Sequence, residues 1–243
     1  MRPMTRTGRR ARSSPSEVPG STVRPSYIAD MTTTGRVWAG VTAFAVAAGI
    51  VVQLFVTANG TEGFFRDNPE RVLNVFAYFT IQSNLLLGAT VLMLALQPDR
   101  RQSTLFKTLR LNGVLCIAVT GVVYHVALAG LDDLAGWAAV ANFLLHTATP
   151  ILGVLGWLLF GPRGATDLRI VRWSIVYPLL WLVFTLVRGE FVGFYPYPFV
   201  DVGEHGYARV LLNCLLVAVL FLALAAGASF LDRRLHRKTT VER

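Results

Sequence analysis

The chain has 243 residues, of which 53% are hydrophobic and only 15% carry a formal charge. A water-soluble domain has about 25% charged residues, so this composition excludes a soluble globular fold and is typical of a protein embedded in lipid. The net charge of +9 does not form a basic stripe with interleaved stacking aromatic residues, which argues against binding to nucleic acid.

Six apolar stretches follow one another, each long enough to cross a hydrocarbon core of about 30 Å, which takes about 20 residues as a helix. They lie at residues 36–58, 72–97, 109–130, 136–160, 170–193 and 206–231. We therefore predict an all-α fold, a polytopic membrane helix bundle of six transmembrane helices that forms one domain over residues 36–231.

The two flanking segments differ from this domain in composition. Residues 1–35 are rich in Arg, Ser, Pro and Thr without apolar periodicity, which predicts a disordered basic tail. Met31, just before the first span, is an alternative start of the chain. Residues 232–243 are expected to form a short basic C-terminal tail.

Positive charge is distributed unequally between the two sides of the predicted bundle. Nineteen of the 23 Lys and Arg residues lie in the tail through Arg36, in 97–111, in 161–172 and in the C-terminal tail. Because loops on the cytoplasmic side carry an excess of Lys and Arg, both termini are predicted to be cytoplasmic. The compact, Arg-rich and Ala-rich chain is typical of a multi-pass protein of the bacterial cell membrane.

Polar side chains interrupt the last five spans, and most of them fall in the predicted outer half of the bilayer. They are Asn74, Tyr78, Thr80, Gln82, Ser83 and Asn84; Asn112, Thr120, Tyr124 and His125; Asn142, His146, Thr147 and Thr149; Thr185, Arg188 and Glu190; and Asn213. Polar groups within a membrane are costly and usually functional, so this pattern predicts a polar cavity that opens toward the outer leaflet.

Thr80 and His146 lie at matching depth in the second and fourth predicted spans. Each is about nine residues, or about 13 Å, from the outer end of its span at the helical rise. A hydroxyl and an imidazole at one level of a low-dielectric bundle are the components of a nucleophile and its base. Pro150, four residues after His146, is expected to kink the helix beside the imidazole.

Three pieces of sequence resemble the androgen-induced-gene and androgen-dependent TFPI-regulating protein family of multi-spanning membrane proteins. They are Tyr78, Phe79 and Thr80 followed by Asn84; Asn142, His146 and Thr147 followed by Pro150; and Tyr197, Pro198 and Phe199 before the last span. The resemblance covers residues 36–231. It implies a membrane-embedded threonine hydrolase of fatty acid esters of hydroxy fatty acids, with Thr80 as nucleophile and His146 as its partner.

The neighbouring polar residues provide candidates for supporting roles in such a reaction. Asn84, Gln82 and Asn142 are candidate donors to an oxyanion, and Asn142 or Tyr124 is a candidate to orient His146. Residues expected at the cavity are His125, Arg188, Glu190, Tyr195 and Tyr197. Arg188 and Glu190 are two residues apart on a helix, so each is expected to pair with another element.

The segment that holds Tyr195 and Tyr197 contains two prolines and several aromatic residues. It is either an aromatic belt and turn at the membrane interface or a cap over the outer cavity.

Other functions remain alternatives. A non-catalytic lipid-binding or scaffold protein is compatible with every pattern above. His125 and His146 are candidate haem ligands, but their depths differ by about 6 Å. A transporter is disfavoured because there is neither an inverted repeat nor a pair of broken helices. We expect no cofactor and no metal, and membrane lipids or an amphiphilic ester as partners; the sequence leaves the oligomeric state open.

Overall fold

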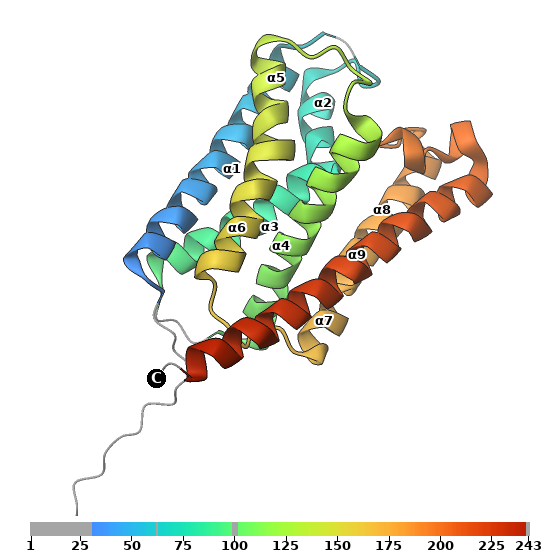
Figure 1. Ribbon diagram of the computed structural model, residues 1–243. Coiled ribbons are helices and arrows are strands. Elements are labelled where there is room, and N and C mark those ends of the chain that lie inside the picture. Colours follow the sequence, from blue (N-terminus) through green and yellow to red (C-terminus); the bar gives the residue numbers. More distant parts are fainter. Residues whose placement is uncertain (1–30, 62, 99–101, 242–243) are drawn as a thin grey trace, which may run out of the picture.

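The computed structural model describes residues 31–61, 63–98 and 102–241. Within these ranges the regular structure is helical and contains no strand. Six helical runs are long and apolar enough to cross a membrane, at Thr33–Asn59, Phe79–Leu96, Thr104–Leu128, Gly136–Phe160, Leu168–Val192 and Val202–Arg237. The predicted fold, an all-α bundle of six membrane-spanning helices, is confirmed (Figure 1).

The helices follow one another along the chain as α1 (Thr33–Asn59), α2 (Asn68–Asn74), the 3-10 turn η1 (Val75–Ala77), α3 (Phe79–Leu96), α4 (Thr104–Val123), the π-helical turn η2 (Tyr124–Leu128), α5 (Gly136–Phe143), the π-helical turn η3 (Leu144–Ala148), α6 (Thr149–Phe160), α7 (Leu168–Ser174), α8 (Val176–Val192), the 3-10 turn η4 (Pro198–Val200) and α9 (Val202–Val241). We call the end with residues 63–67, 129–135 and 193–201 the upper end and the opposite end the lower end, as they lie in Figure 1.

Two predicted boundaries lie elsewhere in the structure. Helix α1 begins at Thr33, capped by the Thr32 hydroxyl, which accepts a hydrogen bond from the Gly35 N–H at 3.1 Å. The last residues of the predicted 1–35 tail, from Thr33, are therefore helical, and residues 1–30 lie outside the described residues. Helix α9 continues to Val241, so the described part of the predicted 232–243 tail extends the last helix.

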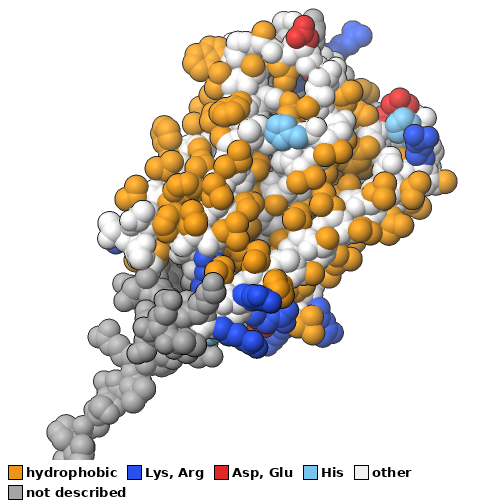
Figure 2. Space-filling view, in the orientation of Figure 1, with side chains coloured by type: hydrophobic (Ala, Val, Ile, Leu, Met, Phe, Trp, Pro, Cys, Tyr) orange, Lys and Arg blue, Asp and Glu red, His pale blue; other side chains and the backbone are white. Residues whose placement is uncertain are grey.

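The distribution of side chains is that of a protein with lipid as its solvent. Large apolar side chains face outward along the spans, among them Phe44, Val126 and Phe191, with 75%, 81% and 85% of their surface exposed. Hydrophobic side chains cover the middle of the face shown in Figure 2, and Lys and Arg side chains gather at its lower end. Polar groups such as Thr42, Ser83, Asn84 and Thr149 are buried inside the bundle.

Helices α1, α3, α4 and the α5–α6 span form the closely packed part of the bundle. Small residues permit this contact, as is usual between membrane helices. A Cβ on Gly113 of α4 would lie 3.0 Å from the Cα of Leu87 in α3. A Cβ on Gly88 would lie 2.8 Å from a methyl group of Val46 in α1. Helix α4 therefore approaches the backbone of α3, and α1 packs a valine side chain against α3 at the neighbouring residue.

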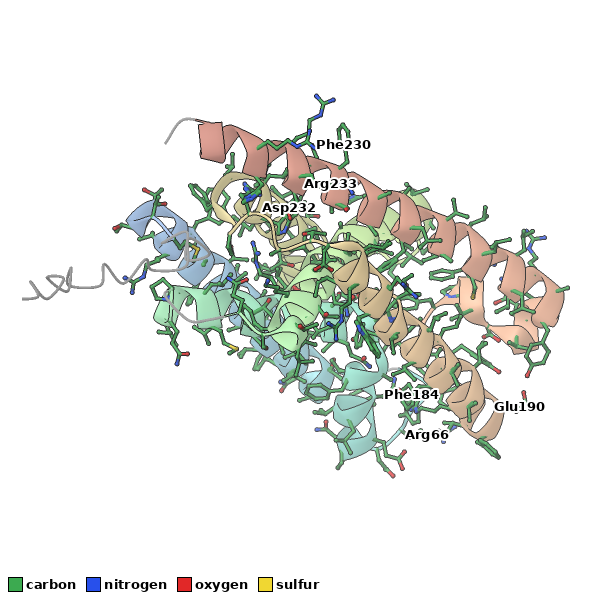
Figure 3. The ribbon with its side chains drawn as sticks, turned by 90° about the horizontal axis from the view of Figure 1, so that it is seen from below. Arg66, Phe184, Glu190, Phe230, Asp232 and Arg233 are labelled. Carbon is green, nitrogen blue, oxygen red and sulfur yellow. The ribbon has the colours of Figure 1, made fainter. Side chains whose placement is uncertain are left out.

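Helices α8 and α9 lie at the side of this packed part (Figure 1). The lower end of α9 is held by Asp232, which is buried and accepts from the N–H groups of Gly164 and Thr166 at 3.1 and 2.8 Å. Asp232 lies on the inner side of α9, whereas Phe230 is half exposed on its outer side (Figure 3). This attachment sets the position of the last helix against the loop before α7.

Candidate active site

Thr80 is placed by a break in the second predicted span. The backbone of Tyr78 is extended (φ −72°, ψ 133°), and α3 begins immediately after it at Phe79. The prediction that Thr80 lies about nine residues into a continuous helix is therefore wrong, because Thr80 is the second residue of α3. At this position its N–H has no acceptor within the helix. The N–H donates instead to the Tyr197 hydroxyl at 3.0 Å.

Asn84, one turn further along α3, connects Thr80 to the fourth span. Its Nδ2 donates to the carbonyls of Thr80 at 2.8 Å and Leu145 at 3.1 Å, and its Oδ1 accepts from Thr149 Oγ1 at 2.6 Å. Both amide hydrogens are therefore used. Asn84 was predicted as a donor to an oxyanion, and its contacts instead hold α3 against the fourth span.

His146 lies in the π-helical turn η3, directly before Pro150. Proline has no N–H, so a carbonyl in the preceding turn loses its helical donor. The Leu145 carbonyl accepts from Asn84 Nδ2 and Thr149 Oγ1 instead. π-Helical turns occur often at functional sites, and this one presents His146 to α3.

The side chains of Thr80 and His146 are in hydrogen-bonding contact, with Thr80 Oγ1 3.2 Å from His146 Nε2. His146 Nδ1 lies 3.2 Å from the Asn142 carbonyl. A carbonyl can only accept, so Nδ1 carries the proton and Nε2 is free to accept from the Thr80 hydroxyl. The Tyr197 hydroxyl lies 3.0 Å from Thr80 Oγ1 on its other side. The hydrogen bonds thus run in one direction, from Tyr197 through Thr80 and His146 to Asn142.

Asn142 and Tyr124 fix the imidazole of His146 together. The Tyr124 ring stacks on His146 with centroids 4.3 Å apart, and its hydroxyl accepts from Asn142 Nδ2 at 2.5 Å. Asn142 therefore holds the imidazole through its carbonyl and holds the stacking ring through its amide. Both residues have the orienting position that the sequence predicted for them. His125, next to Tyr124, is more exposed and bonds through Nε2 to Thr147 Oγ1 at 3.1 Å.

Gln82 does not join this cluster. Its Nε2 donates to the Phe76 carbonyl and its Oε1 accepts from Tyr177, both at 2.9 Å. The prediction of Gln82 as an oxyanion donor is not supported by this arrangement, since its amide links the break before α3 to α8. Ser83 donates toward the Thr80 carbonyl and contacts the Thr120 hydroxyl, each at 3.0 Å, and so does not meet the histidine.

Three further predicted cavity residues lie near the upper end but away from the dyad. Arg188 donates to Asn74 Oδ1 at 2.8 Å, and Glu190 accepts from Tyr207 at 3.2 Å. Each therefore pairs with another element, as their spacing predicted. The Tyr195 ring lies against Gly189, where a Cβ would clash with it.

Two cavities meet at the dyad. The larger, of about 530 Å³, extends from Thr80 and His146 past Asn142 to Arg71 and Asp132 at the upper end; we call it the polar chamber. The smaller, of about 230 Å³, is lined by apolar side chains of α4, α8 and α9, including Val119, Leu182 and Phe221; we call it the apolar chamber. Four residues line both chambers, namely Thr80, Leu128, His146 and Tyr197.

The direct contact of Tyr197 with Thr80 was missed by sequence reasoning, which placed Tyr197 only at the cavity. Tyr197 is 8% exposed, and burial raises the pKa of its phenol to about 12. The hydroxyl is therefore protonated at neutral pH and available as a donor. The aromatic and proline residues of 194–199 indicated an interfacial turn or a cap over the cavity. No sequence pattern indicated that this segment contacts the start of α3.

Fold and site together define a polytopic helical membrane protein with a Thr–His–Tyr cluster between a polar and an apolar cavity. Comparison of the chain with protein-family models, curated proteins and solved structures found no match. The functional argument therefore rests on the geometry of these residues.

Proposed function

We propose that the protein is a lipid-ester hydrolase in which Thr80 is the nucleophile and His146 its general base. The observation that carries the proposal is the directed hydrogen-bond chain at the dyad. His146 Nε2 lies 3.2 Å from Thr80 Oγ1 while Nδ1 is held by the Asn142 carbonyl. A nucleophile, a base within reach and a third group that orients the base are the arrangement expected for covalent catalysis.

The reaction follows from the positions of these groups. His146 Nε2 takes the Thr80 proton as Oγ1 bonds to the ester carbonyl carbon, which leaves a tetrahedral oxyanion. Collapse of this intermediate breaks the bond to the alcohol oxygen, and His146 returns the proton to the departing alcohol. Water, deprotonated by His146, then attacks the acyl-threonine; the bond from the acyl carbon to Oγ1 breaks, His146 returns the proton to Oγ1, and the fatty acid is released. The polar chamber offers water a route to the dyad.

Two features near Thr80 would stabilise the oxyanion. The Tyr197 hydroxyl, 3.0 Å from Oγ1, is a neutral donor that can follow the developing charge. The N-terminus of α3, at which Thr80 lies, contributes the positive end of the helix dipole. Neither Asn84 nor Gln82 is needed for this role.

The apolar chamber supports a lipid substrate. Leu179 and Leu222 line it and also keep 53% and 48% of their surface exposed, so an acyl chain can enter between α8 and α9 from the bilayer. We propose that the upper end faces the outside of the cell membrane and both termini the cytoplasm, because most Lys and Arg residues belong to the opposite side. The resemblance to the androgen-induced-gene hydrolases implies the same roles for Thr80 and His146.

A fluorescent fluorophosphonate tests the proposal on the detergent-purified, full-length protein. Labelling is expected in the wild type and in Ser83→Ala, a matched control that removes a hydroxyl three residues from the nucleophile. Labelling is expected to be lost in Thr80→Ala and His146→Ala at unchanged thermal stability. Labelling that persists in Thr80→Ala, or a wild type that neither labels nor cleaves fluorogenic acyl esters, would contradict the proposal and favour a non-catalytic lipid-binding protein.

A further inference from the structure

Given the proposed hydrolase activity, on which this inference rests, we infer that the substrate is an ester of one fatty acyl chain with a compact, uncharged, hydroxyl-bearing alcohol. The acyl chain occupies the apolar chamber and the alcohol the polar chamber. Glycerol is the simplest alcohol of this class, which makes a monoacylglycerol the reference substrate. Esters that join two long chains are excluded from this class.

The position of the dyad between the two chambers indicates where the acyl chain of the ester lies. Thr80 and His146 line both cavities, so an ester carbonyl at Oγ1 must send its two substituents in different directions. The side toward α8 and α9 is apolar apart from the residues around the dyad. The acyl chain therefore belongs on this side, where it displaces no water from polar groups.

The polar chamber sets the nature of the alcohol. Its wall includes the Tyr78 hydroxyl and the Asp132 carboxylate, for which no hydrogen bond is found among the described residues. A second long chain in this chamber would cover these groups without replacing their hydrogen bonds, which is unfavourable. An alcohol with hydroxyls can donate to Asp132 and bond to Tyr78. The volume of the polar chamber, about 530 Å³, lies within the range of about 300–1,000 Å³ that is usual for small-molecule sites.

The charged residues of the chamber favour a neutral alcohol over an anionic one. Arg71 is the cation that lines it, but its guanidinium donates to the carbonyls of Gly60 and Arg66 at 2.7 and 2.5 Å. Its Nε is buried and has no partner within the described part of the chain, so it does not face the chamber as a donor. Asp132 adds a negative charge at the upper end. A phosphate or free carboxylate on the alcohol would be repelled by the Asp132 carboxylate. It would also find no guanidinium with free N–H donors for a bidentate hydrogen bond.

A series of esters with one acyl group tests the inference on the purified full-length protein in detergent. The series contains monopalmitoylglycerol, methyl palmitate, cetyl palmitate, palmitoyl lysophosphatidic acid and the palmitoyl ester of hydroxystearic acid. Monopalmitoylglycerol is expected to have a kcat/KM at least about tenfold above those of the two-chain and phosphorylated esters. Equal or faster hydrolysis of any of these three esters would overturn the inference.

Two variants separate the chambers without touching the dyad. Ala138 is half-buried in the polar chamber, one turn before Asn142, and Leu182 lines the apolar chamber. Ala138→Phe is expected to lower kcat/KM for monopalmitoylglycerol about tenfold and that for methyl palmitate by less than about twofold. Leu182→Trp is expected to lower both equally. The same loss on both esters in Ala138→Phe would contradict the placement of the alcohol.

Failure of the inference can be told from failure of the proposed activity. Hydrolysis that depends on Thr80 but shows no preference among the alcohols refutes the substrate class and leaves the dyad in place. Hydrolysis of no ester, together with no fluorophosphonate labelling, refutes both. Labelling without hydrolysis of any ester refutes the substrate class alone.

Discussion

Replacing Tyr197 with phenylalanine removes one oxygen from the centre of the proposed site. The Thr80 N–H donates to this hydroxyl at 3.0 Å, and Thr80 Oγ1 lies at the same distance from it. Thr80 is 6% exposed and Tyr197 8%, and no other acceptor for the Thr80 N–H is found among the described residues. An unsatisfied buried donor costs about 1–3 kcal/mol, and the free energy of unfolding is expected to fall by about this amount.

The same variant is expected to lower the rate of acylation. Loss of one donor to an oxyanion costs about 10²–10³ in kcat in other hydrolases. The assay is the rate of fluorophosphonate labelling, measured beside thermal unfolding of the same detergent preparation. Tyr195→Phe is the matched control, because it removes a hydroxyl from the same segment for which no hydrogen bond is found among the described residues. If Tyr197→Phe and Tyr195→Phe unfold at the same temperature and label at the same rate, the reasoning about Tyr197 is refuted.

Four further outcomes follow from individual contacts. Asn84→Leu removes one hydrogen bond from each of the Thr80 carbonyl, the Leu145 carbonyl and the Thr149 hydroxyl, so the free energy of unfolding should fall by about 1–3 kcal/mol and labelling should be lost, both measurable on one preparation. Gly189→Ala places a Cβ in the space of the Tyr195 ring and should slow labelling, which Tyr195→Ala in the same chain should restore if the clash is the cause. Asp232→Ala should lower the unfolding temperature more than Asp232→Asn, which keeps one acceptor for the loop before α7; equal effects would contradict the attachment. Because burial raises the pKa of Tyr197 to about 12, its contribution to stability should be complete below pH about 10 and decline as pH rises to about 12, and the difference between wild type and Tyr197→Phe should narrow over that interval.

The sequence predicted the number of spans because lipid selects long apolar stretches, and these are visible in composition alone. It also predicted the pairing of Thr80 with His146, although the reason given for it was partly wrong. The apolar pattern predicts an unbroken helix over 72–97, which would place Thr80 deep within the span, whereas α3 begins at Phe79. The extended residue Tyr78 is neither Gly nor Pro, and neither of its neighbours is, so no turn signal marks the break.

The parts of the site that the sequence did not predict depend on contacts between distant residues. Tyr197 meets Thr80 across a separation of 117 residues, and no periodicity within either segment encodes that contact. The role of Asn84 was misjudged for a similar reason. Its spacing placed it on the face of Thr80, but only the fold brings the Leu145 carbonyl and Thr149 to its amide.

The π-helical turns η2 and η3 each add one residue to the usual turn, and Tyr124 and His146, which stack on one another, belong to these two turns. One residue rotates a helix by about 100°. Deletion of a single residue from η3, which joins α5 to α6, would therefore rotate α5 and its Asn142 about the helix axis relative to α6. The register of α5 at the upper end and that of α6 in the packed part of the bundle are thus set separately, by the turn between them.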